Sequence, residues 1–290
     1  MTIRIGISGC RYAPWRGVFY PEALPQRSEL AYAAGLFPSV EINGSFYSLQ
    51  SPASWRAWRD AVPDGFVFAV KGPRFITHMK RLQDIEIPLA NFFASGVLAL
   101  DDRLGPLLWQ LPPNLAFDPA RMTAFLSLLP RDTTAALSLA RRRETARMKG
   151  RSALPQLPQR PIRHAIEVRH ASFQTPEFMA LLREHGVGLV VSDSAGRHPV
   201  TEDVTADFIY IRLHGDTELY TSGYGDAALD RWAQRIRRWA AGGEPRDAQR
   251  SAPRAPRARE GRDVYCYFDN DAKVHAPFDA QALARRLPAS

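Results

Sequence analysis

The chain has 290 residues with a formal net charge of +8, and 45% of its residues are hydrophobic and 23% charged. These values are typical of a folded globular protein. No apolar run approaches the roughly 18 residues that a membrane-spanning helix needs, and residues 1–9 alternate as in a strand rather than a signal peptide. The two cysteines, which form no CxxC pair, argue against a disulfide scaffold and a structural zinc site. We therefore expect a cytoplasmic protein with no membrane attachment.

Short apolar segments predict eight strands, which alternate with segments of helical periodicity. The expected strands are residues 3–8, 39–42, 66–70, 107–110, 164–168, 188–192, 208–213 and 264–268. Capping residues, in most cases followed by proline, mark expected helix starts at Ser51, Asp118, Thr175 and Asp226. Eight such units predict one α/β domain over residues 1–290, folded as a (β/α)8 TIM barrel. The competing fold is an open doubly wound sheet, but no GxGxxG follows the first strand.

Side-chain alternation within these strands assigns the two faces of the expected barrel. In the seventh strand, Ile209, Ile211 and Leu213 would face the helices, which leaves Arg212 and His214 facing the barrel axis. The same alternation directs four more polar residues inward, namely Glu41, Lys71, Gln110 and Glu167. The sixth and eighth strands do not resolve in this way. The inward polar residues follow the carboxyl-terminal strand ends, where barrel enzymes build their active sites.

Two basic segments interrupt the pattern and carry most of the excess charge. Residues 141–163 hold eight Lys or Arg and one acid, and residues 243–262 hold six Arg and three acids. The second segment is rich in Ala, Pro and Arg and lacks apolar anchors, which predicts a disordered insertion before the last strand. For the first segment, surface charge and a contact with nucleic acid both remain open.

Seven segments together resemble the YecE-like family, a group of uncharacterised TIM-barrel proteins also called domain of unknown function 72. They are GISGCRYAPWRGVFYP (6–21), VEINGSFY (40–47), FAVKGPRFITH (68–78), LLWQLPP (107–113), IEVRHASF (166–173), YIRLHG (210–215) and YCYFDND (265–271). The resemblance implies a barrel fold but no settled activity. The family's recurrent polar residues correspond to Glu41, Asn43, Tyr47, Lys71, Gln110, Glu167, Arg169, His170, Asp193, Arg212, His214 and Asn270.

The sequence departs from the family pattern at a few positions. Cys10 and Arg11 stand where many members carry an aromatic and a small residue, and we expect this change to alter the pocket rim. Asp269 stands where the family often has Asn, and we expect it not to touch the pocket.

Four inward or rim residues are candidates for catalysis. Lys71 can act as a base or a Schiff-base nucleophile if burial lowers its pKa, or it can pair with Glu41 or Glu167. Glu167 is a candidate general acid or base tuned by Arg169, although a structural Glu–Arg pair explains it equally well. His214 and Asp193 are the remaining candidates for proton transfer.

A second set of residues is suited to binding a polar or anionic substrate. Arg169 and Arg212 can hold a carboxylate or phosphate, and the glycine- and hydroxyl-rich loop 215–225 follows the strand after which barrels often bind phosphate. The others, which offer hydrogen bonds or aromatic faces, are Glu41, Asn43, Tyr47, Gln110, His170, Tyr224 and Asn270.

We predict no cofactor and no metal site. Glu41, Glu167, His170, Asp193 and His214 are suitable zinc or manganese ligands if they converge. The cations expected beside them, Lys71, Arg169 and Arg212, would repel a metal ion, and no HxH or HExxH motif is present.

These observations predict an acid–base enzyme, of hydrolase or lyase type, acting on a small anionic substrate that bears a phosphate or carboxylate. One alternative is a nucleic-acid-binding or repair protein related to metal-dependent barrel nucleases, with residues 141–163 contacting phosphates. Another is a non-catalytic ligand sensor. The oligomeric state is left open, and fold analogy cannot choose among these functions.

Overall fold

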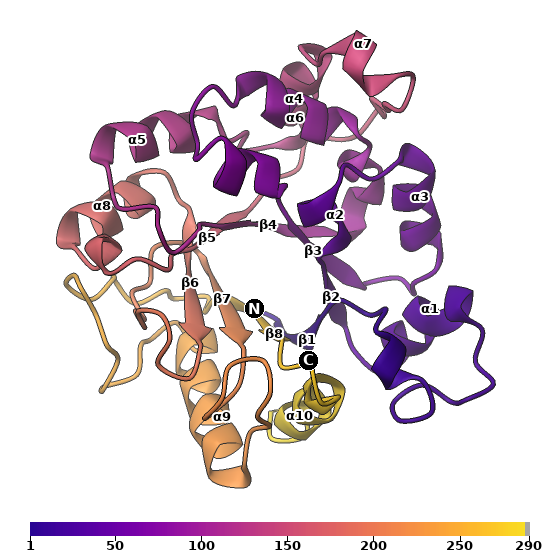
Figure 1. Ribbon diagram of the computed structural model, residues 1–290. Coiled ribbons are helices and arrows are strands. Elements are labelled where there is room, and N and C mark those ends of the chain that lie inside the picture. The colour runs from indigo at the N-terminus through magenta and orange to yellow at the C-terminus, as the bar shows by residue number, and fades with distance from the viewer. Residues whose placement is uncertain (288–290) are drawn as a thin grey trace.

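Eight parallel strands, each hydrogen-bonded to its neighbours in chain order, close into a barrel in the computed structural model (Figure 1). The structure describes residues 1–287. The strands are β1 (Ile3–Ser8), β2 (Ser39–Ile42), β3 (Val67–Lys71), β4 (Leu104–Gln110), β5 (His164–Glu167), β6 (Gly188–Asp193), β7 (Phe208–Leu213) and β8 (Asp263–Phe268). The predicted (β/α)8 TIM barrel is confirmed.

Helices surround this barrel, and the capping residues named above begin three of them. The Ser51, Asp118 and Thr175 side chains accept hydrogen bonds from the backbone N–H three residues further on. The helices are α1 (Glu29–Ala34), α2 (Gly44–Tyr47), α3 (Pro52–Asp60), α4 (Glu86–Ala94), α5 (Pro119–Leu128), α6 (Thr133–Arg141), α7 (Thr145–Met148), α8 (Pro176–Glu184), α9 (Asp226–Ala240) and α10 (His275–Ala284). Short 3-10 or π turns occupy Ala13–Trp15, Gln26–Ser28, Phe75–Met79, Val97–Arg103 and Ala171–Phe173.

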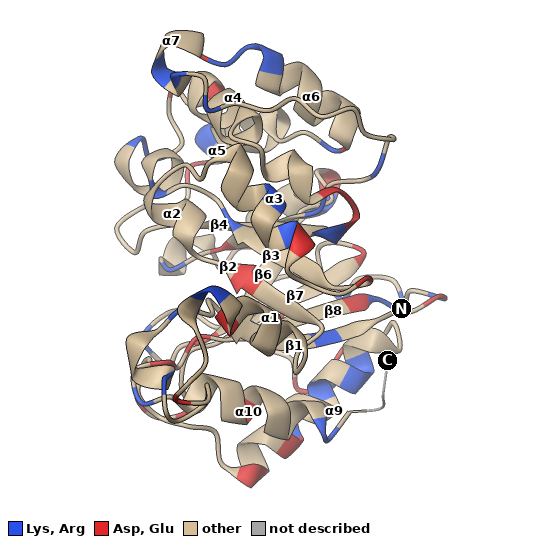
Figure 2. Cartoon of the chain, turned by 90° about the vertical axis from the view of Figure 1, so that its right-hand side faces the viewer, with Lys and Arg blue, Asp and Glu red and all other residues tan. Residues whose placement is uncertain are grey.

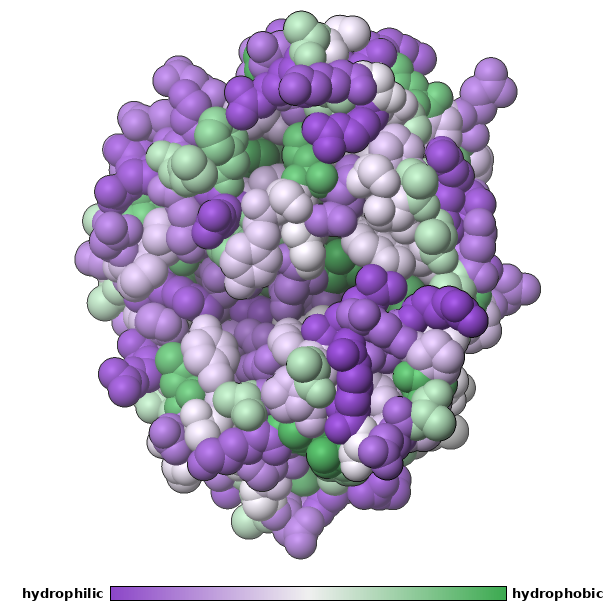
Figure 3. Space-filling view, turned by 45° about the vertical axis from the view of Figure 1, so that its right-hand side comes forward, coloured by the Kyte–Doolittle hydropathy of each residue, from purple (hydrophilic) through white to green (hydrophobic). Residues whose placement is uncertain are grey.

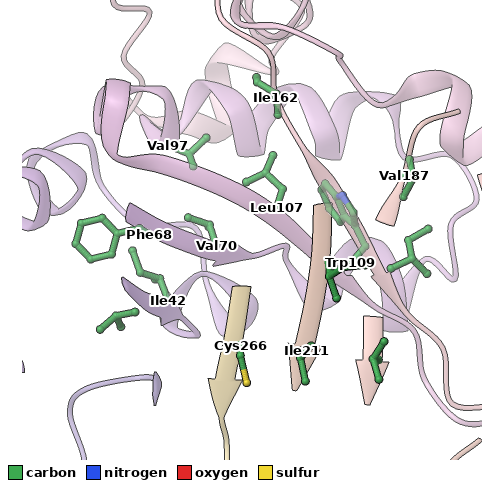
Figure 4. Close-up of a cluster of buried hydrophobic side chains, with 14 of the residues drawn as sticks. Ile42, Phe68, Val70, Val97, Leu107, Trp109, Ile162, Val187, Ile211 and Cys266 are labelled. Carbon is green, nitrogen blue, oxygen red and sulfur yellow. The ribbon is translucent and has the colours of Figure 1, made fainter. Parts of the chain in front are cut away.

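The hydrophobic core has two layers separated by the barrel wall. The larger layer lies between strands and helices and contains Ile42, Phe68, Val70, Trp109 and Ile211 (Figure 4). The smaller layer fills the barrel interior and consists of Val67, Ala69, Leu108, Ala165, Val190, Phe208, Tyr210, Tyr265 and Tyr267. The predicted alternation is therefore confirmed for β7, and the structure also settles β6 and β8, whose Val190, Tyr265 and Tyr267 point inward.

The structure does not show the predicted disorder of residues 243–262. Two carboxylates from the loop between β6 and β7 hold the segment. Glu202 accepts a hydrogen bond from Gln249 N, and Asp203 accepts from Ser251 N and Ala252 N at 2.8 and 3.0 Å. Ala252 also packs against the core. Composition is misleading here because these carboxylates lie about 50 positions before their partners in the chain, and within the segment Glu244 also accepts from Ala255 N and pairs with Arg250.

Removing the Asp203 carboxylate is expected to release this segment. Asp203→Ala leaves two backbone N–H groups without acceptors, at a cost of about 1.5 kcal/mol or more for each hydrogen bond to a charged group. Tryptic cleavage at Arg250 and Arg254 should therefore become about tenfold faster or more, because proteolysis follows the population of the open form. The control is Asp207→Ala, which removes an exposed partner of Arg163. Equal cleavage of both variants would contradict this account of the segment.

The other basic segment, residues 141–163, runs from the end of α6 through α7 to β5, and Figure 2 shows basic residues along α6 and α7. Arg142, Arg160 and Arg163 form ion pairs with carboxylates of other elements. Arg141, Arg147, Lys149 and Arg151 are exposed. Within residues 1–287, no helix is both long and apolar enough to span a membrane.

Candidate active site

A cavity of about 590 Å³ opens at the carboxyl-terminal ends of the first strands. Figure 3 shows the molecular surface hollowed on one face, with hydrophilic residues on the floor of the hollow. Five of the predicted site residues line the cavity: Glu41, Asn43, Tyr47, Lys71 and Gln110. Its other polar lining residues include Arg11, Tyr12, Tyr220, Asp269 and Asp271.

Arg212 is the centre of a buried charge cluster beside this cavity. Its guanidinium lies 2.9 Å from Glu41 Oε1, 2.7 Å from Glu167 Oε2 and 2.8 Å from Asp269 Oδ2. It also donates to Ser8 Oγ, and its side chain is 0% exposed. Because these partners surround it, Arg212 holds three carboxylates in place rather than presenting a free fork to a substrate.

Glu167 is held as a carboxylate by partners on both of its oxygens. Arg169 donates to Oε1 from Nε and Nη2, while Gln110 Nε2 donates to Oε2 at 2.9 Å. Burial alone would raise the pKa of Glu167, but the Arg169 and Arg212 charges hold it well below the ordinary value. A carboxylate with so low a pKa is a poor proton carrier near neutral pH, so the geometry favours a positioning role for Glu167.

Asp269 belongs to the same cluster, and the expectation that it does not touch the pocket is wrong. It lines the cavity and lies 3.0 Å from His214 Nδ1, in addition to its contact with Arg212. Burial would raise its pKa, but Arg212 and His214 together lower it below the ordinary value. His214 is itself buried between Asp269 and Glu167, with its Nε2 3.6 Å from Glu167 Oε1.

Lys71 differs from the charged groups of the Arg212 cluster because its amine forms no ion pair with a described residue. Among residues 1–287, no carboxylate oxygen lies within 4.0 Å of Lys71 Nζ, although the side chain is buried. The amine instead lies over the Phe46 ring, 4.4 Å from the ring centroid. Burial, assisted by the Arg212 charge, lowers the pKa of Lys71 to about 8. Part of the amine is therefore unprotonated at neutral pH.

Asp271 is the second group of the cavity that titrates near neutrality. Burial and the neighbouring Asp269 charge raise its pKa to about 6. Tyr12, which lines the same wall, donates its hydroxyl to Ser8 O at 2.8 Å. Asp269 and Asp271 thus differ in role: the first stays ionised, while the second can exchange a proton.

Replacing Asp271 with asparagine is expected to stabilise the protein at pH 7. A carboxyl whose folded pKa is raised binds its proton more tightly in the folded state, so wild-type stability falls as pH rises from 3.8 to about 6. Asp271→Asn removes this loss, so its stability advantage should be largest at pH 7 and small at pH 4. Urea denaturation at the two pH values measures it, with the exposed-site variant Asp60→Asn as control. An advantage independent of pH would contradict the assignment.

Eight predicted site residues do not line the cavity. Four of them, Glu167, Arg169, Arg212 and His214, lie in the buried charge cluster beside it, and the other four lie elsewhere. Asp193 accepts a hydrogen bond from the Tyr224 hydroxyl at 3.2 Å, and that hydroxyl accepts from Gly215 N. Asn270 donates to Ser222 O and to Asp279. Asp193, Tyr224 and Asn270 therefore anchor the loop 215–225 outside the cavity, and their expected contact with substrate is not supported. His170 binds Ser172 at the start of the turn after β5.

The hydroxyl groups of the loop 215–225 are also engaged locally. Ser222 Oγ accepts from Thr217 N and Glu218 N, and Thr221 Oγ1 donates to Leu219 O. Tyr220 is the loop residue that lines the cavity, where its hydroxyl accepts from Arg169 Nη2 at 3.3 Å. The loop therefore shapes one wall of the cavity and does not offer a ready phosphate site.

The carboxylates that would be metal ligands converge on a guanidinium instead. Arg212 occupies the space between Glu41, Glu167 and Asp269, so a metal ion there would compete with a fixed positive charge. Across residues 1–287, no group of three or more His, Cys, Asp or Glu is arranged to hold a metal ion.

Sequence reasoning missed Ser8, Asp269 and Asp271, although alternation contained a signal for two of them. Ile3, Ile5 and Ile7 pack outward, which directs Ser8 inward. In the last strand, Tyr265 and Tyr267 point inward, and Asp269 continues that row. Asp271 lies beyond the strand, where alternation no longer applies.

Comparisons with known proteins agree with this architecture. The family model described as "Protein of unknown function DUF72" matches residues 4–290. A crystal structure of a DUF72 family protein from Thermotoga maritima MSB8 is similar, with a TM-score of 0.73, 23% sequence identity and 98% coverage of both chains. A DUF72 family protein from Enterococcus faecalis V583 has a TM-score of 0.68 and 16% identity, over 100% of this chain and 96% of that one. No curated protein matches the sequence. The chain belongs to the DUF72 family of proteins of unknown function.

Proposed function

We propose that the protein is an acid–base enzyme that acts on a small anionic substrate in the cavity at the mouth of the barrel. The observation that carries the proposal is the unpaired amine of Lys71, enclosed beside a cluster in which Glu167 and Asp269 both pair with Arg212. Holding a lysine without a counter-ion in a buried place is costly, because desolvation disfavours its charge. Catalytic sites use such lysines as bases or nucleophiles.

Positive charge on one side of the cavity supports an anionic substrate. Burial, together with the Lys71, Arg169 and Arg74 charges, lowers the pKa of His78 to about 4. Three cations therefore act on one neighbourhood, and Arg74 lies over the Tyr47 ring at the rim. Arg11 is the second basic residue that lines the cavity. Its guanidinium would hold a carboxylate or phosphate, which leaves the Lys71 amine to accept a proton.

The remaining charged residues fit supporting roles in this proposal. Asp271, with its pKa of about 6, is the candidate proton donor on the side of the cavity next to β8. Arg212 and Glu167 are positioning residues, because their polar atoms bind each other and not the cavity. Asn43, Tyr47 and Gln110 supply neutral contacts along the wall.

The test compares the wild type with Lys71→Met on a mixture of phosphorylated and carboxylated metabolites, followed by mass spectrometry. Lys149→Met is the matched control, because Lys149 is exposed on another part of the surface. We expect at least one anionic compound to be consumed by the wild type and the control but not by Lys71→Met. Binding without consumption would favour the ligand-sensor alternative and would contradict an enzyme.

The nucleic-acid alternative has a separate test. Residues 141–163 retain four exposed cations, Arg141, Arg147, Lys149 and Arg151. Binding through them would weaken steeply as salt concentration rises and would be lost in a variant with all four replaced by glutamine. The cavity makes no contribution to this prediction, so the two functions can be tested independently.

A further inference from the structure

Lysine is rare in this protein, and its position in the cavity is therefore informative. Of 38 basic Lys and Arg residues, lysine occupies only positions 71, 80, 149 and 273. Lys71 is the buried one of these four, whereas Lys149 and Lys273 are exposed. An arginine stays protonated in proteins, while a lysine can lose its proton and become a nucleophile. Of the two basic residues that line the cavity, Arg11 and Lys71, the lysine is thus of the type that can react covalently.

We propose that Lys71 forms an imine with a small substrate that carries both a carbonyl group and an anionic group, such as a 2-oxo acid or a phosphorylated aldehyde or ketone. This inference rests on the proposed function and names its substrate class. The carbonyl requirement follows from the amine, and the anionic requirement follows from Arg11, the other basic residue that lines the cavity.

The chemistry balances with groups that line the cavity. The Nζ lone pair attacks the carbonyl carbon, and the carbonyl π electrons move to the oxygen, which takes up a proton to give a carbinolamine. The nitrogen then loses a proton and forms the C=N bond as the hydroxyl group leaves as water. A protonated acid must assist that departure, and Asp271 is the lining carboxyl whose raised pKa allows it to carry a proton.

The surroundings of Lys71 fit a nucleophile better than an ion-pair partner. Its neighbours Glu41, Glu167 and Asp269 all direct oxygens to Arg212. The Phe46 ring covers the amine on another side. With a pKa of about 8, about a tenth of the amine is unprotonated at pH 7, against about four in ten thousand for an ordinary lysine. This favours Lys71 by about two hundredfold over an ordinary lysine in the fraction able to attack.

The test is reductive trapping on the full-length protein. Pyruvate and dihydroxyacetone phosphate serve as probes, with cyanoborohydride as the reductant, and peptide mass spectrometry locates the adduct. We expect Lys71 to gain the mass of the probe less one oxygen atom, at least tenfold faster than Lys149, Lys273 or the exposed Met1 amine. Lactate, which carries a carboxylate but no keto group, should occupy the same site without forming an imine and so slow labelling by pyruvate.

Variants separate this inference from the proposed function. Lys71→Met and Lys71→Arg should both abolish the adduct, while Lys149→Met should keep it at the wild-type rate. If Lys71→Arg abolishes turnover of the metabolite mixture but the wild type gives no adduct, Lys71 is a base and the imine is excluded. If wild-type protein shows neither turnover nor adduct, both proposals fail. If all four lysines are labelled at the same rate, the imine proposal is overturned.

Discussion

Arg212→Met is expected to lower the free energy of unfolding by about 3–5 kcal/mol, which is typical of breaking a buried ion pair. The substitution keeps much of the side-chain volume but removes the cation shared by Glu41, Glu167 and Asp269, all of which lie in or next to the closed barrel. Each carboxylate would then remain buried beside the others with too few donors. Urea denaturation monitored by tryptophan fluorescence measures the loss.

Two further variants show whether charge or packing causes that loss. Adding Glu167→Gln to Arg212→Met removes one of the stranded carboxylates, so the double variant should lose less stability than the sum of the two single variants. Arg59→Met breaks a surface pair with Asp60 and should cost less than about 1 kcal/mol. A loss for Arg212→Met as small as that of Arg59→Met would show that the cluster is not centred on Arg212.

Lys71→Met is expected to reduce turnover by about a hundredfold or more, the range for removal of a general acid–base group. The variant should be at least as stable as the wild type at pH 7. A buried lysine whose pKa is lowered to about 8 destabilises the fold while it is charged, and this penalty is relieved as pH rises from about 8 to 10.5. Loss of activity together with retained stability separates a catalytic residue from a structural one.

The pH dependence of the wild type provides a second measurement on Lys71. Because the active form needs an unprotonated Lys71 amine and a protonated Asp271, kcat/KM should follow a bell-shaped curve with its maximum between about pH 6 and pH 8. Lys71→Arg should be as inactive as Lys71→Met, since a guanidinium does not deprotonate. A fully active Lys71→Arg variant would assign Lys71 to charge stabilisation alone.

Local patterns in the amino-acid order are sufficient to predict the barrel. Strand segments, capping residues and two-residue alternation are properties of near neighbours, and they place Ile211 outside and Arg212 inside without any tertiary contact. The same alternation correctly brings Lys71 and Gln110 to the cavity.

Closure of the barrel decides which of the inward charges pair and which stay free. Arg212 and Glu41 are 171 positions apart and meet only because eight strands complete a ring. The amount of charge at the mouth follows from composition, but the lone amine of Lys71 and the lowered pKa of Asp269 depend on where Arg212 lies. The raised pKa of Asp271 depends on its burial beside the Asp269 charge.

Tertiary structure also decides two further predictions that local patterns got wrong or left unsupported. Asp193, Tyr224 and Asn270 are polar residues near strand ends, as substrate ligands are, but they bind the loop 215–225 from outside the cavity. Residues 243–262 have the composition of a disordered segment, but Glu202 and Asp203 hold their backbone. Alternation and composition are local, whereas hydrogen bonds and ion pairs join residues that only the folded chain brings within 3 Å of one another.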